Sequence, residues 1–529
     1  MIRRRHMLAA AFACLALATA TACGSSGSTT DAGNPAAQED ATPCPAVNKA
    51  DIDPTATFTW MYSVDTTSFD PDKITTNNSQ MYLYPIYDSL THIDAKGEPQ
   101  PMLAKKWTVG DGGKSLTLDL ISNWKYQDGT PFDAASVKAN LDRHRAAGSW
   151  NEEALKDITN VAVVDQDTVK VDTNGGAAAL VNIFAGSAGM MMSPAVFDDP
   201  NQALKPTGGS GAFTMTSYTP GSKVEYTAVK NYWDPDSLHV AKMVYLVSGD
   251  DNARLNSVST GVANATFLRA SMYQPAKDAG LVICQRPSLS MYTMNLNIAK
   301  PNLGKKEVRQ AINYAIDRNA IKSLTDGFCT PAIQMFPPSY FAANPDLGPD
   351  DYKYNPDKAK DLLKKAGLDK GFEFSLDVQN LDIYKQIAEV IQANLKDVGI
   401  SMKIIPVDIS KAPQDFSVDK SVDAYLGEQK VDADPSIEIE SYYLKGGFNN
   451  PGGYDNPKVA QLAEEAKSGA DTEARAKSYA ELMKTVYEDA APNVTLCHLT
   501  TPFTLDHKTM GVEIYTDASR QFRGVAIKK

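Results

Sequence analysis

The chain has 529 residues, of which 43% are apolar and 9% aromatic, so it can bury the cores of two or three domains. Its formal net charge of −12 makes nucleic acids and anionic lipid surfaces poor partners. The six histidines are scattered singly and no two cysteines have metal-site spacing. We therefore expect no zinc or other metal site, and no cofactor.

Residues 1–22 have the pattern of a secretion signal. Three arginines precede the apolar run LAAAFACLALATA, which is shorter than the roughly 20 residues that a membrane-spanning helix needs. The rest of the chain has a net charge of −15, because residues 1–22 hold three arginines and no acidic residue. Both the general and the twin-arginine export routes remain open.

Cys23 directly follows Ala20-Thr21-Ala22. This arrangement resembles the bacterial lipobox, in which the cysteine sulfur receives a diacylglycerol. We expect lipidation at Cys23 and anchoring to the outer face of the cytoplasmic membrane, with an ordinary signal and an incidental cysteine as the alternative. Residues 23–45 lack large apolar side chains, so we expect a flexible tether with a mean reach of ~25 Å.

The part of the chain that follows has the pattern of an α+β block, with alternating apolar residues, turn residues and helix caps. The expected elements are a strand over residues 58–64, a helix over 82–90 that Pro85 interrupts, a strand over 115–120, a turn at Asp128-Gly129, a helix over 134–145 capped by Asp133, and two short strands within 161–172.

From residue 302 the pattern changes to helices that alternate with strands, which predicts an α/β lobe. A strand, a helix and a second strand over residues 372–408 imply a right-handed parallel crossover. The expected elements are one helix over residues 305–326 ended by Gly327, a helix over 357–366 started by Asn355-Pro356, a strand over 372–379, a helix over 382–398 and a strand over 400–408.

Four cysteines follow residue 23, an even number in an exported protein, so two disulfides are expected. Three pairings are open. We favour Cys44 with Cys284 and Cys329 with Cys497.

Several segments together resemble the bacterial extracellular solute-binding proteins of family 5, the receptors of ATP-driven importers for peptides, nickel complexes and some sugars. The match follows one order along nearly the whole chain after the tether. Its segments are PMLAKKWTV (101–109), WKYQDGTPFDAASVKANLDR (124–143), PTGGSGAFTMTSYTPGSKVEYTAVKNYW (206–233), MYTMNLN (291–297), EVRQAINYAIDRNAI (307–321), NPDKAKDLLKKAG (355–367), DADPS (432–436) and GGYDNPKVAQLAEEA (452–466).

The resemblance implies an α/β, two-lobed periplasmic-binding-protein fold of type II, in the peptide-binding cluster, with an extra α+β domain inserted in lobe 1. Two chain crossings, near residues 292–297 and 501–505, would form a hinge that closes over a ligand. The expected domains are lobe 1 over residues 45–90, 207–293 and 503–529, the inserted domain over 91–206, and lobe 2 over 294–502.

The resemblance also indicates ligand-binding residues. In peptide-binding members an aspartate in an aromatic-Asp-Tyr-x-Asp-Pro stretch pairs with the ligand's ammonium group, and here the matching aspartates are Asp432 and Asp434,. For these two, a loop turn before Pro435 is the structural alternative. The other candidates, for which turns or core packing are the alternative, are Ser63, Val64 and Asp65 after the first strand, Gly209 and Ser210 in a glycine-rich loop, and Met291, Tyr292 and Asn295 on a crossing strand.

The function implied is that of a monomeric, membrane-tethered receptor that captures a small solute between its lobes and delivers it to the permease subunits of an ABC importer. A peptide or another amine-bearing compound is the favoured solute, and an oligosaccharide or a nickel chelate is the alternative. A secreted hydrolase is the competing class. The sequence contains neither G-x-S-x-G nor His-Glu-x-x-His,, although a carboxylate-pair glycosidase would need no fixed motif. We therefore expect a binding protein without catalytic residues.

Overall fold

The computed structural model describes residues 41–408, 411–430 and 434–529. The expected secretion signal, Cys23, most of the expected tether and Asp432 lie outside these residues. No helix in the described ranges is long and apolar enough to cross a membrane.

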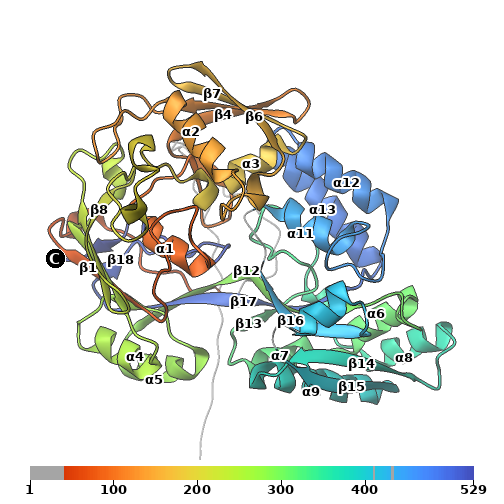
Figure 1. The fold of residues 1–529 in the computed structure, drawn as a ribbon. Helices are drawn as coiled ribbons and strands as arrows, with labels where there is room; N and C mark the ends of the chain where they lie inside the picture. The colour runs from red at the N-terminus through yellow and green to blue at the C-terminus, as the bar shows by residue number, and fades with distance from the viewer. Residues whose placement is uncertain (1–40, 409–410, 431–433) are drawn as a thin grey trace, which may run out of the picture. The chain divides into compact units, whose positions relative to one another are not determined.

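Within the described residues, eleven strands form one sheet, which in Figure 1 runs from β8 and β1 at the left through β12 and β17 to β14 and β15 at the lower right. Its order is β15-β14-β16-β12-β17-β11-β1-β10-β9-β8, and β13 pairs with β17. The strands are β1 (Thr57–Tyr62), β8 (Phe213–Thr219), β9 (Lys223–Ala228), β10 (Lys242–Val247), β11 (Ala265–Thr266), β12 (Val282–Leu296), β13 (Cys329–Pro331), β14 (Phe372–Gln379), β15 (Ile400–Val407), β16 (Ala424–Lys430) and β17 (Asn493–Leu505).

Lobe 1 is the name we use for the part whose core gathers around Trp60, Tyr245 and Phe503. Its helices are α1 (Gln80–Leu83), α4 (Asp251–Ser259) and α5 (Tyr273–Asp278), and β18 (Thr509–Met510) pairs with β19 (Ala526–Ile527). The helix expected over residues 82–90 is wrong in extent: α1 ends two residues before Pro85, because proline lacks the amide hydrogen and its ring clashes with the preceding turn.

The inserted region, as we call it, has a separate core that includes Leu118, Leu141 and Val171. Asp133 caps α2 as expected: its Oδ1 accepts from the Ser136 amide at 2.9 Å, and Ser136 Oγ accepts from the Asp133 amide at 3.0 Å. The elements are β2 (Thr91–Ile93) paired with β3 (Pro99–Pro101), the antiparallel sheet of β4 (Ala104–Gly110), β5 (Ser115–Leu120), β7 (Thr168–Thr173) and β6 (Ile158–Asp165), and helices α2 (Ala134–His144) and α3 (Ala177–Ile183).

Lobe 2 is the part built on two further cores, one around Ile312 and Leu376 and one around Phe336 and Tyr479. Strands β14 and β15 flank α9 and pair in parallel, as expected. The helices are α6 (Lys306–Ala315), α7 (Arg318–Leu324), α8 (Pro356–Lys365), α9 (Asp382–Asp397), α10 (Lys411–Pro413), α11 (Pro435–Tyr443), α12 (Pro457–Ser468) and α13 (Thr472–Glu488).

The single helix expected over residues 305–326 is two helices, α6 and α7. Ile316 has extended backbone angles, and Asp317 caps α7 by accepting from the amides of Asn319 and Ala320. Ile316 is nevertheless buried, so the apolar spacing continues across the break and hides it in the sequence.

Short turns complete the chain. A π-helical turn spans Gln414–Val418, and 3-10 turns span Lys49–Asp51, Asn77–Ser79, Glu153–Leu155, Ser187–Gly189, Pro194–Val196, Pro200–Ala203, Pro235–Ser237, Ala270–Met272 and Pro349–Tyr352.

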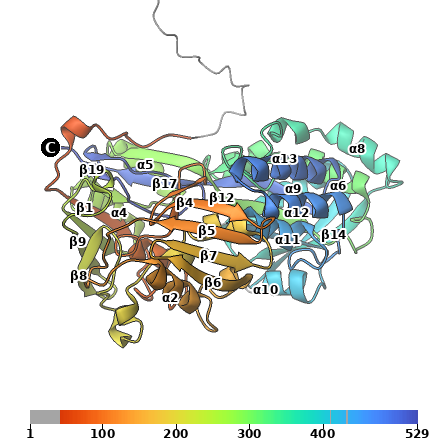
Figure 2. The ribbon, with the colours of Figure 1, turned by 90° about the horizontal axis from the view of Figure 1, so that it is seen from above.

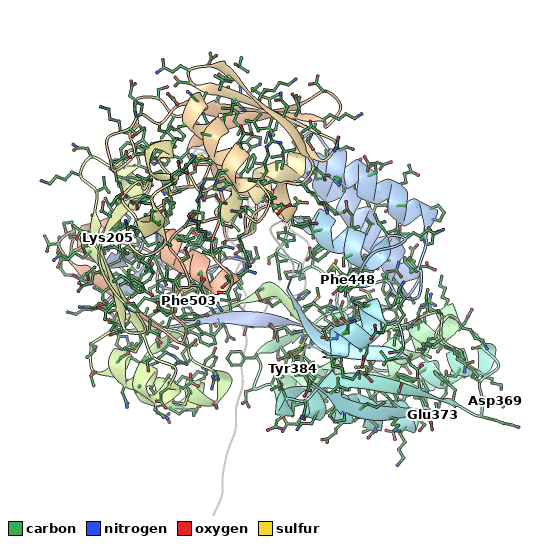
Figure 3. All side chains as sticks on the ribbon, viewed as in Figure 1. Lys205, Asp369, Glu373, Tyr384, Phe448 and Phe503 are labelled. Carbon is green, nitrogen blue, oxygen red and sulfur yellow. A yellow bond between two sulfur atoms is a disulfide. The ribbon has the colours of Figure 1, made fainter. Side chains whose placement is uncertain are left out.

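Two long antiparallel strands, β12 and β17, connect the lobes. On β17, Cys497 belongs to a lobe 2 core and Phe503 to the lobe 1 core, and on β12 Cys284 belongs to lobe 1 and Tyr292 to lobe 2. Figure 3 labels Phe503 in lobe 1 and Tyr384 in lobe 2. The centre of the Tyr384 ring lies 5.5 Å from the centre of the Tyr292 ring. The crossing on β12 therefore lies before Tyr292, a few residues earlier than expected.

Both disulfides involve these connecting strands. Cys44 is joined to Cys284 of β12, with Cα atoms 5.0 Å apart, and Cys329 of β13 is joined to Cys497 of β17, with Cα atoms 5.2 Å apart. This is the pairing favoured from the sequence. The first bridge holds the start of the described chain on lobe 1, and the second fastens β13 to the connecting strand.

Candidate functional site

A cavity of about 390 Å³ lies where lobe 1, the inserted region and lobe 2 meet. This volume is within the range of small-molecule binding sites. Residues from all three parts form its wall: Tyr62, Tyr84 and residues 516–520 from lobe 1; Trp150, Asn151 and Ser187 from the inserted region; Tyr340, Ser436, Glu440 and Lys467 from lobe 2; and Leu289 from β12.

The charged side chains of the cavity wall are more often acidic than basic. Among the described residues they are Glu153, Asp157, Glu440 and Asp517 on the acidic side, and Lys156, Lys467 and Arg520 on the basic side.

A bridge of three charges spans the inserted region and lobe 2. Lys467 Nζ of α12 lies 2.8 Å from Glu440 Oε1 of α11 and 3.6 Å from Asp157 Oδ2 of the inserted region. Burial alone would lower the pKa of Lys467, but the two carboxylates raise it above its ordinary value. Helices α3 and α12 also contact each other, as Figure 1 shows, and Figure 2 shows α12 from above, next to α11 and α13. We call these three residues the Lys467 bridge.

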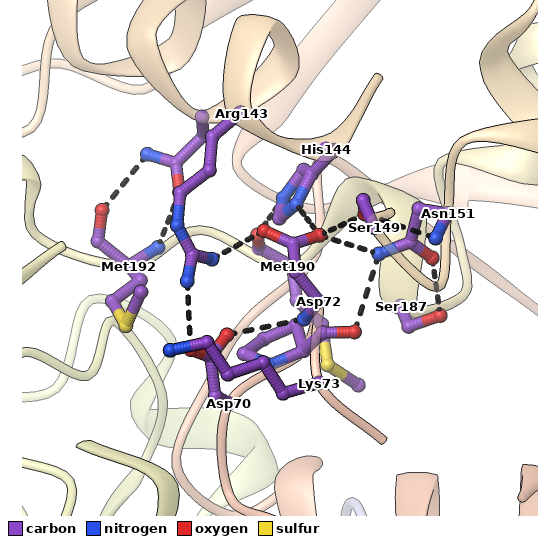
Figure 4. Close-up of polar contacts among 12 residues, drawn as sticks. Asp70, Asp72, Lys73, Arg143, His144, Ser149, Asn151, Ser187, Met190 and Met192 are labelled. Atoms are coloured by element: carbon purple, nitrogen blue, oxygen red, sulfur yellow. Dashed lines mark hydrogen bonds and ion pairs between the residues drawn. The ribbon is translucent and has the colours of Figure 1, made fainter. Parts of the chain in front are cut away.

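A buried polar network supports the cavity wall on the side of the inserted region (Figure 4). Asn151 Nδ2 donates to Asp72 Oδ1 at 2.9 Å, and Ser187 Oγ donates to Asn151 Oδ1 at 2.7 Å. Burial disfavours the charged form of Asp72, but His144 and Arg143 outweigh it and hold the pKa of this carboxyl well below its ordinary value. The network thereby fixes Asn151 and Ser187, which line the cavity.

Asp434 caps α11 and is fully buried. Its Oδ1 accepts from the Ser436 amide at 3.0 Å and from Ser436 Oγ at 2.7 Å, and both its oxygens accept from Arg475. The Asp434 carboxylate therefore has its hydrogen-bond partners within the protein and positions Ser436, which lines the cavity. Asp432 lies outside the described residues.

Ser63, Val64 and Asp65 follow β1 but are not part of the cavity wall, which the last β1 residue, Tyr62, reaches instead. Asp65 Oδ2 accepts from Tyr218 Oη at 2.9 Å and from the Gly221 amide at 2.6 Å. These contacts connect Asp65 to the end of β8 and to the loop that follows it.

Gly209 and Ser210 lie where the inserted region joins lobe 1, away from the cavity wall. A Cβ atom on Gly209 would come within 2.4 Å of the Ile86 carbonyl oxygen. Ser210 is fully buried, and its Oγ donates to the Met191 carbonyl at 2.7 Å and accepts from the Asp88 amide at 2.9 Å. The glycine is therefore required for close packing.

Met291, Tyr292 and Asn295 are buried on β12 and also lie outside the cavity wall. Met291 packs in one lobe 2 core and Tyr292 in the other. Asn295 Oδ1 accepts from Asn493 Nδ2 at 2.7 Å, a contact that ties β12 to β17. These three residues therefore pack within the connecting strands and the lobe 2 cores rather than in the cavity wall.

Sequence reasoning missed the turn over residues 516–520, which projects into the cavity. The Ala518 amide donates to the Tyr515 carbonyl at 3.0 Å, and Ala518 has a φ of 59°, a left-handed conformation that costs energy for a residue with a Cβ. The Ser519 amide donates to Asp517 Oδ1 at 2.9 Å. The stretch TDASR has turn composition, but nothing in it indicates a cavity.

Comparisons with known proteins agree on the kind of protein. The model of "Bacterial extracellular solute-binding proteins, family 5 Middle" matches residues 98–473. The glutathione-binding protein GsiB of Escherichia coli O6:K15:H31 is 30% identical over 355 residues, which cover 65% of this chain and 68% of GsiB. The relatives found are solute-binding proteins rather than enzymes.

Solved structures show the same fold. HbpA2 from Haemophilus parasuis superposes with a TM-score of 0.82 at 22% identity, covering 90% of this chain and 100% of HbpA2. DppA from Helicobacter pylori, in complex with the peptide STSA, superposes with a TM-score of 0.68 at 22% identity, covering 90% and 99%. The two-lobed α/β fold of type II periplasmic binding proteins is confirmed.

Proposed function

Because the chain belongs to the bacterial extracellular solute-binding proteins of family 5 and is the substrate receptor of an ABC importer, we propose that its solute is a peptide or another amine-bearing compound. The observation that carries this proposal is the cavity of about 390 Å³, in whose wall Asp517 is an acidic side chain that forms no ion pair with any described residue, whereas Glu153, Asp157 and Glu440 pair with lysines. An ammonium group that leaves water needs a carboxylate partner. GsiB is named for glutathione and DppA holds a peptide, which supports the same class of solute.

The cavity wall carries carboxylates on two sides. Asp517 comes from the lobe 1 turn and Glu440 from α11 of lobe 2. A solute that touches both sides collects all its contacts only when the lobes are closed around it, so binding favours closure over an open form. The antiparallel pair β12 and β17 is the connection about which such a motion would turn,.

Asp432 is our proposed partner for the solute's ammonium group, ahead of Asp434. The Asp434 carboxylate accepts from Arg475 and Ser436, whereas Asp432 precedes it by two residues in the matching stretch.

We also propose that the mature protein is exported and held at the membrane by a diacylglycerol on Cys23. Cys44 forms the first disulfide. The lipid on Cys23 would therefore be attached some 20 residues before the point at which this disulfide fastens the chain to lobe 1. Intact mass spectrometry of membrane-extracted protein should show the lipid on Cys23. The Cys23→Ser variant should appear in the soluble fraction, and a variant still held at the membrane would overturn the proposal.

We further propose that the receptor is a monomer, which light scattering of the detergent-free body tests.

Peptide capture tests the proposed solute. The purified protein is mixed with a library of tri- to pentapeptides, and the bound species are read by native mass spectrometry. We expect one peptide per protein molecule, released unchanged. Cleaved peptides would indicate an enzyme. Capture of oligosaccharides or of a nickel–histidine complex from parallel mixtures, with no peptide bound, would assign one of the other solutes.

A further inference from the structure

Arg520 lies at the end of the cavity turn and is half-buried in the cavity wall. Its guanidinium is 4.7 Å from the centre of the Tyr62 ring and 5.2 Å from that of Phe267. Stacking on aromatic faces is a favourable position for a guanidinium. It leaves the edge of the group, where the N–H donors point, for other partners.

This edge has no hydrogen-bond or ion-pair partner among the residues that the structure describes. Arg520 Nε is buried and makes no hydrogen bond, and in the part of the chain that the structure describes no carboxylate lies within 4.0 Å of the guanidinium. A buried donor without a partner costs free energy, more so when it is charged. The other bases of the cavity wall differ: Lys156 lies 2.6 Å from Glu153, and Lys467 lies 2.8 Å from Glu440.

Two other arginines, one in the inserted region and one in lobe 1, each contact a carboxylate. Arg143 contacts Asp70 and Asp72, and Arg523 contacts Asp234. Arg520 is placed on aromatic rings in the same manner as Arg523 on Trp233, yet lacks the carboxylate. The neighbouring acid, Asp517, accepts from the Ser519 amide and forms no ion pair with Arg520.

We propose that the Arg520 guanidinium binds a carboxylate of the solute, which for a peptide is its free carboxyl terminus. This inference rests on the proposed function and narrows it to solutes that carry an acidic group. The planar fork of N–H donors matches a carboxylate with two hydrogen bonds. The turn of residues 516–520 then presents one acid and one base to the solute from the same wall, which suits a molecule with both an amine and a carboxylate.

Two matched libraries test the inference, one of tri- to pentapeptides with free carboxyl termini and one of the same peptides as C-terminal amides. We expect the native protein to capture the acids at least about thirtyfold more tightly than the amides, as for the loss of a buried charge partner. Arg520→Met should remove this preference, and Arg520→Lys should retain part of it, because lysine keeps the charge but not the fork. Thermal unfolding shows that each variant is folded.

The control is Arg269→Met, at an exposed arginine that does not line the cavity. It should leave the preference for acids unchanged. Equal capture of acids and amides by the native protein would overturn this inference while peptide binding itself stood. A preference that survives Arg520→Met would also overturn it. If neither library is captured, the proposed peptide function and this inference both fall.

Discussion

Both carboxylate oxygens of Asp434 lie next to Arg475 Nη2, at 2.8 and 2.6 Å, and neither side chain is more than 3% exposed. The pair fastens the N-cap of α11 to α13. Removing one partner of such a pair leaves a buried charge without compensation.

Arg475→Met should therefore lower the free energy of unfolding by about 3 to 5 kcal/mol, measured by urea denaturation. Lys458→Met is the matched control. It breaks an ion pair with Glu481 in which both side chains are exposed, so its effect on the free energy of unfolding should be much smaller. Equal losses in the two variants would show that burial does not decide the strength of the Asp434–Arg475 pair.

Asp432→Asn should act on binding rather than on stability. If Asp432 pairs with a peptide ammonium, its loss weakens peptide affinity by about 2 kcal/mol or more, as measured by calorimetry with a peptide captured from the library. The same peptide with an acetylated amino terminus should bind both forms of the protein equally. Unchanged affinity of Asp432→Asn for the free peptide would exclude this residue as the ammonium partner.

Asp72 should make the protein sensitive to acid. Its folded-state pKa is held below the ordinary value, so its contribution to stability is present above the pKa of the unfolded chain and is lost as the pH falls toward the folded-state pKa. Asp72→Asn should be less stable than the native protein at pH 7, and the difference should shrink below about pH 4. Unfolding free energies between pH 2 and 7 measure this, and a constant difference over that range would contradict it.

The two disulfides should contribute strongly to stability, because they close long segments of chain, with sequence separations of 240 and 168 residues. Replacing either pair by alanine should lower the free energy of unfolding by about 2 to 5 kcal/mol, chiefly by freeing the unfolded chain. Intact mass before and after reduction counts the bridges. Identical urea midpoints for the native protein and both double variants would contradict the expectation.

The Lys467 bridge should affect how long the solute stays bound. Lys467→Met removes the charge that joins Glu440 of lobe 2 to Asp157 of the inserted region. Since partly exposed ion pairs contribute about 1 kcal/mol or less, we expect solute dissociation to become about two- to fivefold faster in stopped-flow measurements. Lys156→Met is the control, because Lys156 also lines the cavity but pairs with Glu153 of the same region. Equal effects of the two variants on the rate of solute dissociation would contradict a role of the Lys467 bridge in holding the solute.

Local structure was largely predictable from the sequence. Alternation of apolar residues predicted β5 and β14 to the residue, and Asn355 with Pro356 marked the start of α8. These features depend on neighbouring residues alone, since caps and pleated strands are set by contacts a few residues apart. The break at Ile316 was missed because a buried residue satisfies the same apolar spacing whether or not the helix continues.

The site was far less predictable. The sequence predicted ligand contacts for Ser63, Val64 and Asp65. The cavity wall includes the preceding residue, Tyr62, but none of these three. Only tertiary structure decided that Asp434 faces Arg475, that Arg520 faces none of the described carboxylates, and that residues 516–520 enter the cavity.

By itself, then, the sequence determined the class of protein, the helices and strands, and the expectation of an exported receptor, because each follows from short patterns or from an ordered series of them. The folded chain alone decided which side chains are free to meet a solute. The physical reason is that a charge becomes a binding group only when its hydrogen-bonding capacity is left unused, and this depends on residues distant in the sequence.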